Sequence, residues 1–253
     1  MTKVIAVANA SGSAGKTTTV VSLADLLGRT QRVLVVDADA QGTATAWLGH
    51  DPYALTATLG DVLLRRTSPE SAVLATKVKG VSLLPSNRSL EPATIQLDSA
   101  IGPEQRLRLA LAKLEADVVL IDCPGSVSTI TISGLVAADA VLTVTQPTMK
   151  EATGVPELLD AVEAVREAFN PNLTFAGVVA CIVPPRNQGR VYVDAMTALR
   201  QAYGDDVSPP VRRASQVPDS FARGIPLPSY APNSAPTADY KAVLAWLKNR
   251  GVL

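Results

Sequence analysis

An apolar run that leads directly into a glycine-rich turn constrains this fold more than any other part of the sequence. Residues 4–8 read Val-Ile-Ala-Val-Ala, and residues 9–18 read Asn-Ala-Ser-Gly-Ser-Ala-Gly-Lys-Thr-Thr. This order predicts a buried strand, a loop whose backbone N–H groups wrap around an anion, and a helix that points its positive end at the same anion. The alternative is a tight turn that holds Lys-Thr by chance, but the flanking strand and helix favour phosphate binding.

The side chains of this loop match the needs of a nucleotide with a metal ion. Gly12 and Gly15 leave the backbone free to curl around phosphates, although the spacing between them is shorter than in the common phosphate-binding loop. Lys16 can reach the β- and γ-phosphates, and the hydroxyl of Thr17 can bind Mg²⁺. We therefore predict nucleotide and Mg²⁺ binding by Ser11, Gly12, Ser13, Ala14, Gly15, Lys16, Thr17 and Thr18.

Length and composition fit a protein with one large core. The chain has 253 residues, of which 47% are hydrophobic, so it can bury one substantial core. Its formal net charge is zero, so any basic surface for nucleic acid must be local. Cys123 and Cys181 lie in apolar segments and fit buried thiols of a reducing compartment. Because we see no signal peptide and no apolar run of membrane-spanning length, we expect a cytoplasmic protein.

Short apolar runs alternate with segments of helical period, such as 107–114 and 158–169. This pattern predicts an α/β fold with a doubly wound, mostly parallel sheet flanked by helices, in a single domain over residues 1–253. Residues 208–236 are rich in Pro and Ser and predict an irregular segment packed on the domain, followed by a helix that docks on the core rather than on a membrane. The predicted strands are Val4–Ala8, Val33–Val36, Val81–Leu84, Val118–Ile121, Val141–Thr145 and Phe175–Val183.

Carboxylates follow two of these strands. Asp37 and Asp39 come at the end of the strand at 33–36, and Asp122 ends the strand at 118–121. Open α/β sheets bind ligands at the carboxyl ends of their strands, so these side chains are expected beside the phosphate-binding loop. Asp122 is then placed to bind Mg²⁺ directly or through water, and Asp37 and Asp39 to hold hydrated Mg²⁺ and an attacking water. A turn that merely ends a strand with Asp is the structural alternative.

Taken in order, these motifs resemble the ParA/MinD family of deviant Walker-box ATPases. The matching stretches are the loop at 9–18, Val-Asp-Ala-Asp-Ala-Gln-Gly at 36–42, Ile-Asp-Cys-Pro at 121–124, Gln-Pro at 146–147, Gly-x-Pro at 224–226 and Tyr-x-Pro-x-Ser at 230–234. The resemblance covers essentially the whole chain, is strongest to the ParA branch, and implies a P-loop NTPase fold. It further implies ATP and Mg²⁺ as ligands, slow partner-stimulated ATP hydrolysis, and a homodimer with two ATP molecules sandwiched at its interface.

The same resemblance implies partners and residue roles. The ATP-bound dimer would coat nucleoid DNA without sequence preference, and a small adaptor protein on the cargo, ParB-like or McdB-like, would stimulate hydrolysis and release it. Lys16 and Asp39 would be catalytic, with Asp39 orienting the hydrolytic water. Thr17, Asp37 and Asp122 would serve the metal. Backbone near 184–187 and 211–214 would flank the adenine, which adds Pro184, Arg186, Asn187 and Arg213 to the nucleotide-binding residues.

The loop departs from the family pattern at its first position. The ParA pattern is Lys-Gly-Gly-x-Gly-Lys-Thr, whose first lysine crosses the dimer interface to the partner's phosphates, whereas this chain has Ser11, with Ser13 in place of the second glycine. A serine hydroxyl cannot neutralise charge on a transferring phosphoryl group. Lys150, just beyond a strand's carboxyl end, is the substitute that we predict, although a solvated loop lysine explains it equally well from sequence alone. Carboxysome-positioning, McdA-like members of the family resemble this chain in having Ser at that position and a substitute lysine.

Arginines gather in the C-terminal third without any motif for reading base edges. Such a patch predicts sequence-independent phosphate contacts, doubled in a dimer, through Arg186, Arg190, Arg212, Arg213 and Arg223. We therefore expect a nucleoid-associated ATPase that positions a cargo, with carboxysomes as the first hypothesis. The alternatives are a plasmid or chromosome partition ATPase, a MinD-like membrane-cycling regulator, and a binding module that no longer hydrolyses ATP.

Overall fold

The computed structural model places seven strands in one sheet, in the order β3-β4-β2-β5-β1-β6-β7. It describes residues 2–12, 14–148, 154–184 and 189–253. Six strands are parallel, and only the two-residue edge strand β3 runs antiparallel to its neighbour β4. The strands are β1 Lys3–Ala8, β2 Val33–Asp37, β3 Leu74–Ala75, β4 Val81–Leu84, β5 Val118–Asp122, β6 Ala140–Thr145 and β7 Thr174–Ala180.

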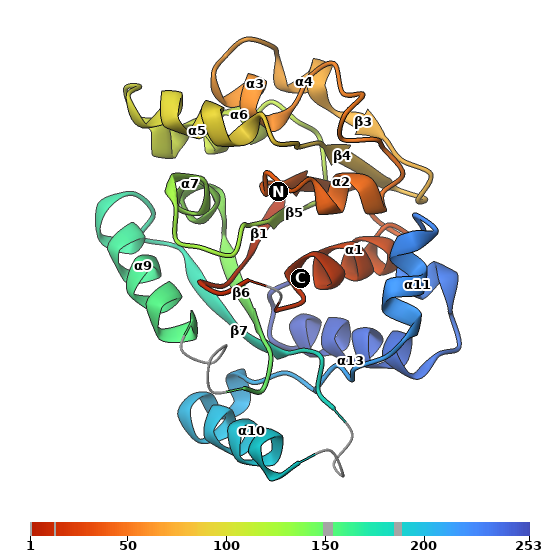
Figure 1. Cartoon of the computed structure of the whole chain (residues 1–253). Helices are drawn as coiled ribbons and strands as arrows, with labels where there is room; N and C mark the ends of the chain where they lie inside the picture. The colour runs from red at the N-terminus through yellow and green to blue at the C-terminus, as the bar shows by residue number, and fades with distance from the viewer. Residues whose placement is uncertain (1, 13, 149–153, 185–188) are drawn as a thin grey trace.

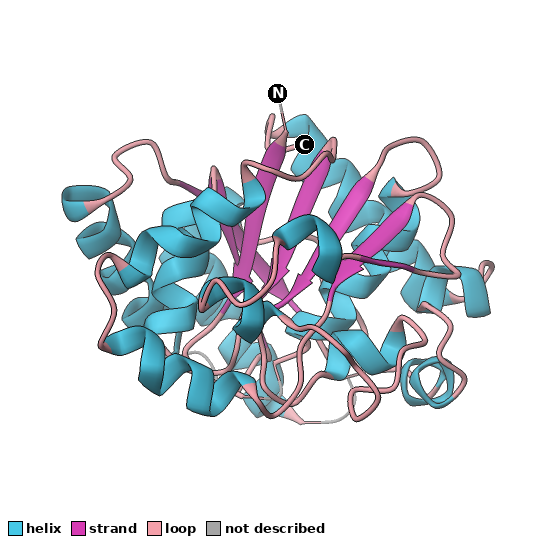
Figure 2. Cartoon of the chain, turned by 90° about the horizontal axis from the view of Figure 1, so that it is seen from above, coloured by secondary structure: helices cyan, strands magenta, loops and turns pink. Residues whose placement is uncertain are grey.

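Helices cover both faces of the sheet, so the described core has two apolar layers (Figures 1 and 2). Side chains of α1 Lys16–Leu27, α2 Thr43–Trp47, α12 Leu227–Tyr230 and α13 Ala235–Asn249 pack on one face, with α11 Gln216–Ala222 at its margin. Side chains of α3 Leu59–Leu63, α4 Pro69–Ala72, α5 Leu90–Asp98, α6 Arg106–Leu111, α7 Thr129–Ala137 and α9 Gly154–Ala168 pack on the other. Helix α10 Arg190–Tyr203 contacts the edge strand β7, and short 3₁₀ turns lie at Pro103–Gln105 and Gly204–Asp206.

The predicted fold class is confirmed, and the differences have local causes. The strand predicted to end at Val183 ends at Ala180, because the chain turns at Ile182, which has a positive φ of 54°. The helix predicted over 107–114 begins one residue earlier and ends at Leu111. Strand β3 has no counterpart among the predictions, since two residues carry no readable alternation.

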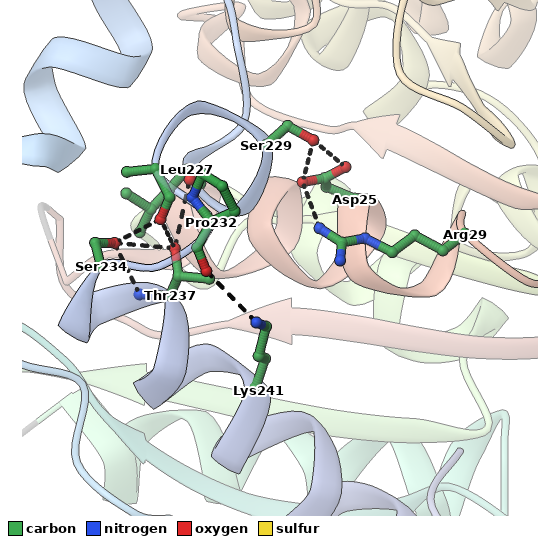
Figure 3. Close-up of polar contacts among 9 residues, drawn as sticks. Asp25, Arg29, Leu227, Ser229, Pro232, Ser234, Thr237 and Lys241 are labelled. Atoms are coloured by element: carbon green, nitrogen blue, oxygen red, sulfur yellow. Dashed lines mark hydrogen bonds and ion pairs between the residues drawn. The ribbon is translucent and has the colours of Figure 1, made fainter.

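The segment predicted to be irregular contains two short helices, α11 and α12, which corrects that part of the prediction. Its packing on the domain is confirmed. Ser229 of α12 donates a hydrogen bond to the buried carboxylate of Asp25 on α1, and Arg29 lies 3.8 Å from the same carboxylate (Figure 3). Burial raises the pKa of Asp25. This contact fastens the C-terminal segment to the helix that follows the phosphate-binding loop.

Helix α13 is capped and docked as a core helix. Ser234 accepts a hydrogen bond from the backbone of Thr237, whose hydroxyl donates to the carbonyls of Leu227 and Ala231 (Figure 3). Tyr240 is buried with its hydroxyl 3.3 Å from that of Thr19 in α1. The apolar face of α13 therefore packs against the protein, as predicted. In the described ranges, no helix is long and apolar enough to cross a lipid bilayer.

Candidate functional site

Strand order brings the two predicted carboxylates together. Strand β5 lies between β1 and β2, and Asp122 at its end is directly opposite Asp37 at the end of β2. On the other side, Asp122 is opposite Val7, shortly before the glycine-rich loop begins. Asp37 and Asp122 are both almost completely buried, with exposed fractions of 0% and 1%. The loop and both carboxylates thus share the carboxyl edge of the sheet, where α/β proteins bind ligands.

The glycine-rich loop is held by its own side chains and by β6. Gly15 has a φ of 95°, which glycine adopts without strain, and it leads directly into α1. The Lys16 ammonium donates a hydrogen bond to the Ser11 carbonyl at 2.9 Å. The Asn9 amide donates to the Val144 carbonyl at 2.6 Å, and its oxygen accepts from the Ser11 backbone at 3.3 Å. Asn9 was not among the predicted site residues, because only the fold places β6 beside it.

Two glycines from distant elements pack against the same loop. A Cβ atom at Gly125, which follows β5, would lie 2.9 Å from the Cα of Gly12. A Cβ atom at Gly154, where the description of α9 begins, would lie 2.3 Å from the side-chain oxygen of Asn9 and 3.3 Å from the hydroxyl of Ser11. The distances of 2.9 and 2.3 Å are too short for a Cβ atom, so a larger residue at Gly125 or Gly154 would require neighbouring atoms to move. Sequence reasoning assigned neither glycine a role, since nothing local marks these close approaches.

The buried carboxylates carry an electrostatic cost. The backbone and the hydroxyl of Thr45 each donate to Asp37 at 2.7 Å, yet burial raises the pKa of Asp37 to about 6. Burial, and then the like charge of Asp37, raise the pKa of Asp122 well above its ordinary value. Neither buried oxygen of Asp122 has a hydrogen bond of good geometry among the described residues, and the nearby Thr17 hydroxyl lowers its pKa only in part.

These features fit a bound divalent cation. An orphaned buried carboxylate next to a second one is stabilised by a double positive charge. The described residues hold no group of three or more His, Cys, Asp or Glu side chains arranged to bind a metal on their own. Mg²⁺ suits such a site, since it commonly takes one or two protein oxygens and completes its shell with water and phosphates. Thr17 and Asp122 are the side chains placed to hold it.

Asp39 lies just beyond the buried pair and is more exposed. Its carboxylate accepts a hydrogen bond from the backbone of Gln41 at 2.9 Å. It lines an open cavity of about 400 Å³, shared with Pro124 and Ser126 from the segment after β5 and with Ile95 from α5. A carboxylate in this position can contact water at the nucleotide-binding edge of the sheet.

A second cavity, of about 450 Å³, runs from the glycine-rich loop towards the C-terminal segment. Gly15, Thr18, Cys181 and Tyr240 line its inner wall, and Val211, Arg212, Arg213, Ala214, Ser215, Val217 and Pro218 are among the residues that complete it. The predicted adenine-flanking residues 211–214 are thus beside the loop. Pro184 is not among the residues that line this cavity. Arg186 and Asn187 lie outside the described residues, as do Ser13 and Lys150.

The arginines predicted to bind DNA have different surroundings. Arg212 makes two side-chain hydrogen bonds to Asp239, at 2.7 and 2.8 Å, so its charge is already compensated. Arg213 is exposed and lines the cavity beside Gly15. Arg223 stacks over the Tyr230 ring at 5.7 Å, and exposed Arg190 begins α10. Their role in DNA binding stays a prediction.

Comparison with known proteins identifies the relatives of this chain. A family model described as an AAA domain matches residues 2–175. The chromosome partitioning protein ParA of Caulobacter vibrioides is 34% identical over 230 residues, which cover 88% of this chain and 86% of that protein. Among solved structures, the chain is similar to a cobyrinic acid a,c-diamide synthase from Mycobacterium smegmatis with bound ADP and magnesium. That similarity has 33% identity, a TM-score of 0.84, and coverage of 99% and 96% of the two chains.

A further structural relative is apo McdA from Cyanothece. The TM-score is 0.85, with 25% identity over 96% of this chain and all of that chain. The sequence identity to McdA is thus lower than that to Caulobacter ParA, and its TM-score is similar to that of the M. smegmatis protein.

We predict that Gly125→Ala weakens binding of Mg·ATP at least tenfold, because the added methyl group meets the backbone of Gly12 and displaces the loop. Isothermal titration calorimetry measures the affinity, and circular dichroism checks the fold. Ser99→Ala is the control, since Ser99 is exposed and lines none of the cavities described, so its loss should leave affinity unchanged. Equal affinity of the Gly125 variant and the parent would contradict the close packing.

We predict that the effect of Asp37→Asn on the stability of the nucleotide-free protein is more favourable at pH 7.5 than at acidic pH, by up to about 3 kcal/mol. A carboxyl with a raised pKa holds its proton more tightly in the folded state, so its contribution to stability falls as pH rises from 3.8 to about 6 and stays low above that. Urea unfolding at pH 4 and pH 7.5 should show this difference. A similar effect at both values would mean that shape, and not charge, is responsible; Asp219→Asn on the surface serves as the control.

Proposed function

The chain belongs to the ParA family of P-loop ATPases, and on this basis we propose that it binds ATP with Mg²⁺ and hydrolyses it slowly as a sandwich dimer. The observation that carries the proposal is the buried pair of Asp37 and Asp122 near Lys16, in which neither oxygen of Asp122 has a hydrogen-bond partner among the described residues. The metal ion would bring positive charge to the two carboxylates, and the triphosphate would bring negative charge to Lys16. The ADP- and magnesium-bound structure of the M. smegmatis relative supports the same ligands.

Each of these side chains has one task in the proposed reaction. Lys16 would leave the Ser11 carbonyl and bind the β- and γ-phosphates, while Thr17 and Asp122 would hold the metal, with Asp37 supporting its shell. When bound, Mg²⁺ would neutralise charge on the phosphates. Asp39 accepts a hydrogen bond from the attacking water and aligns it with the γ-phosphorus. The adenosine occupies the cavity that Arg213 and Val211 line.

The dimer requires a cation in place of the missing loop lysine, and we assign this role to Lys150. Gly154 lies against Ser11, at the position where the family pattern has that lysine. Lys150 precedes Gly154 by four residues in the sequence, which supports it as the candidate for this role. Acting across the interface, it would stabilise the charge on the γ-phosphoryl group of the partner.

The proposed dimer binds nucleoid DNA without sequence preference. A chain with zero net charge gains DNA affinity when dimerisation brings two copies of an arginine patch together. Arg190, Arg213 and Arg223 are the leading contacts, and Arg212 ranks below them because it is paired with Asp239. The protein would then be cytoplasmic and associated with the nucleoid.

An adaptor protein on the cargo would stimulate hydrolysis and release the dimer from DNA. Ser11 and the likeness in fold to McdA support carboxysomes as the first cargo to test. The higher identity to Caulobacter ParA supports partition of a chromosome or plasmid as the second candidate. A membrane-cycling role finds less support, since α13 packs its apolar face against the core.

The name of the diamide synthase relative suggests a different chemistry, and the two cysteines of this chain offer no reactive thiol for it. A cysteine acts as a nucleophile in its thiolate form. Burial raises the pKa of Cys123 to about 12 and that of Cys181 to about 11. Neither thiol would ionise at neutral pH, and both are buried.

Lys150→Ala is expected to abolish ATP-dependent dimerisation and to lower hydrolysis at least a hundredfold, because Ser11 in the loop cannot supply the missing positive charge. Size-exclusion chromatography with ATP measures the dimer, and phosphate release measures turnover. Asp39→Ala is the contrasting variant, since it removes the water-aligning carboxylate and should leave an ATP-bound dimer that does not turn over. A Lys150→Ala protein that dimerises and hydrolyses ATP normally would remove the assigned role.

DNA binding should depend on ATP and salt but not on sequence. We expect the Asp39→Ala protein with ATP to bind two unrelated duplexes with equal affinity, and to lose at least a hundredfold between 50 and 200 mM salt. Fluorescence anisotropy provides the measurement. Arg190→Ala and Arg223→Ala should each weaken binding to both duplexes, whereas Arg200→Ala on the same helix as Arg190 is the matched control. Equal binding with ADP would argue against the dimer as the DNA-binding form.

A further inference from the structure

A cavity of about 610 Å³ lies between α3, α4 and α6, in the helical layer at the top of Figure 1. Its apolar side is formed by Val62, Leu63, Leu109 and Ala110, and Leu109 is 54% exposed. Its polar side carries four cationic side chains and two hydroxyl-bearing ones: Arg65, Arg66, Arg106, Lys113, Thr67 and Ser68. None of these residues lines the cavity beside Gly15, and the lining includes no carboxylate.

The positive charge of this cavity is only partly compensated. Within the described part of the chain, Arg66 is the one lining cation with a carboxylate inside ion-pair distance, Asp61 at 3.8 Å. Glu70 interacts electrostatically with Lys113 but is hydrogen bonded to Ser68. An excess of positive charge remains around an opening, which is favourable for an anion.

Arg106 adds a charged group whose hydrogen bonding is incomplete. One terminal nitrogen of Arg106 donates to the Leu63 carbonyl at 2.8 Å, at the end of α3. The buried Nε of the same guanidinium has no acceptor among the described residues. In the described ranges, no carboxylate lies within ion-pair distance of Arg106. An anion in the cavity would therefore compensate the positive charge of its guanidinium group.

Arg65 stands where the backbone favours glycine. Its φ is 59°, and the backbone N–H groups of Arg65 and Arg66 bond to the carbonyls of Val62 and Asp61, which is the Schellman arrangement that ends a helix. Glycine is usual at this left-handed position, because a side chain there is strained. The chain keeps an arginine at a strained position on the rim of a basic cavity, which is a pattern associated with function.

We propose that this cavity binds an organic phosphate. Arg65, Arg66 and Lys113 would contact the phosphate groups, since guanidinium forks bind phosphate oxygens in pairs. Leu109 and Ala110 would carry the apolar part of the ligand. The volume lies in the range of small-molecule sites, which favours a compact phosphorylated ligand over an extended peptide. The proposal is independent of the ATPase function, because the two sites share no residue.

Calorimetric titration of pyrophosphate and of ADP, both without Mg²⁺, tests the site. The parent chain should show two classes of pyrophosphate site, one lost in Lys16→Ala and the other weakened at least tenfold in Arg65→Gly. ADP should bind the second class at least tenfold more tightly than pyrophosphate, because its ring contacts the apolar side. Arg65→Gly relieves the strained backbone, so its melting temperature should not fall below that of the parent.

Arg108→Ala is the matched control, since Arg108 is exposed on the same helix α6 but does not line the cavity. Its affinity for both probes should change less than twofold. A Lys16→Ala chain that binds neither probe would overturn the proposal. So would residual binding that Arg65→Gly leaves intact, an equal loss in Arg108→Ala, or equal affinity for the two probes. None of these results would contradict the proposed ATPase function. Arg65→Gly should bind Mg·ATP as the parent does, because Arg65 is outside the ATPase site.

Discussion

Repulsion between two buried carboxylates is the interaction on which this site depends. Asp37 and Asp122 end neighbouring strands in direct register and are shielded from water on all sides. Burial raises the pKa of both carboxyls, and the charge of Asp37 raises the pKa of Asp122 further. A folded state with such a pair is less stable than it could be, and ligand binding recovers that stability. The buried carboxylates therefore lower the stability of the free protein and raise its affinity for a metal-bound polyanion.

The surrounding fold is arranged to keep that pair and the loop in place. Gly125 and Gly154 approach the loop backbone too closely for side chains, and Asn9 ties it to β6. Below the loop, the hydroxyl of Thr19 lies within hydrogen-bond range of Tyr240 from the last helix. The nucleotide site is therefore supported by four segments far apart in sequence: the turn after β5, Gly154 of α9, β6 and α13. Rigid support of this kind preorganises the phosphate-binding atoms before the ligand arrives.

Sequence alone predicted the elements well because their physical signals are local. Strands buried on both faces appear as continuous apolar runs, and glycine followed by Lys-Thr marks the loop. The carboxylates were found because they follow those runs. Register, however, is a tertiary property: nothing local says that Asp122 is opposite Asp37, or that Gly154 touches the loop. Likewise, the pairing of Arg212 with Asp239 joins positions 27 residues apart and removes a charge that composition alone had counted as available.

The strand order has a consequence for how the chain acquires its site during synthesis. Strands β1 and β2 are never neighbours, since β5 separates them, and β5 ends only at residue 122. As the chain emerges from the ribosome, the loop and Asp37 are therefore made well before the central strand that enters between them. Tyr240, which lies against Thr19 from α13, emerges later still. The loop of a nascent chain thus lacks part of its support until α13 has been made.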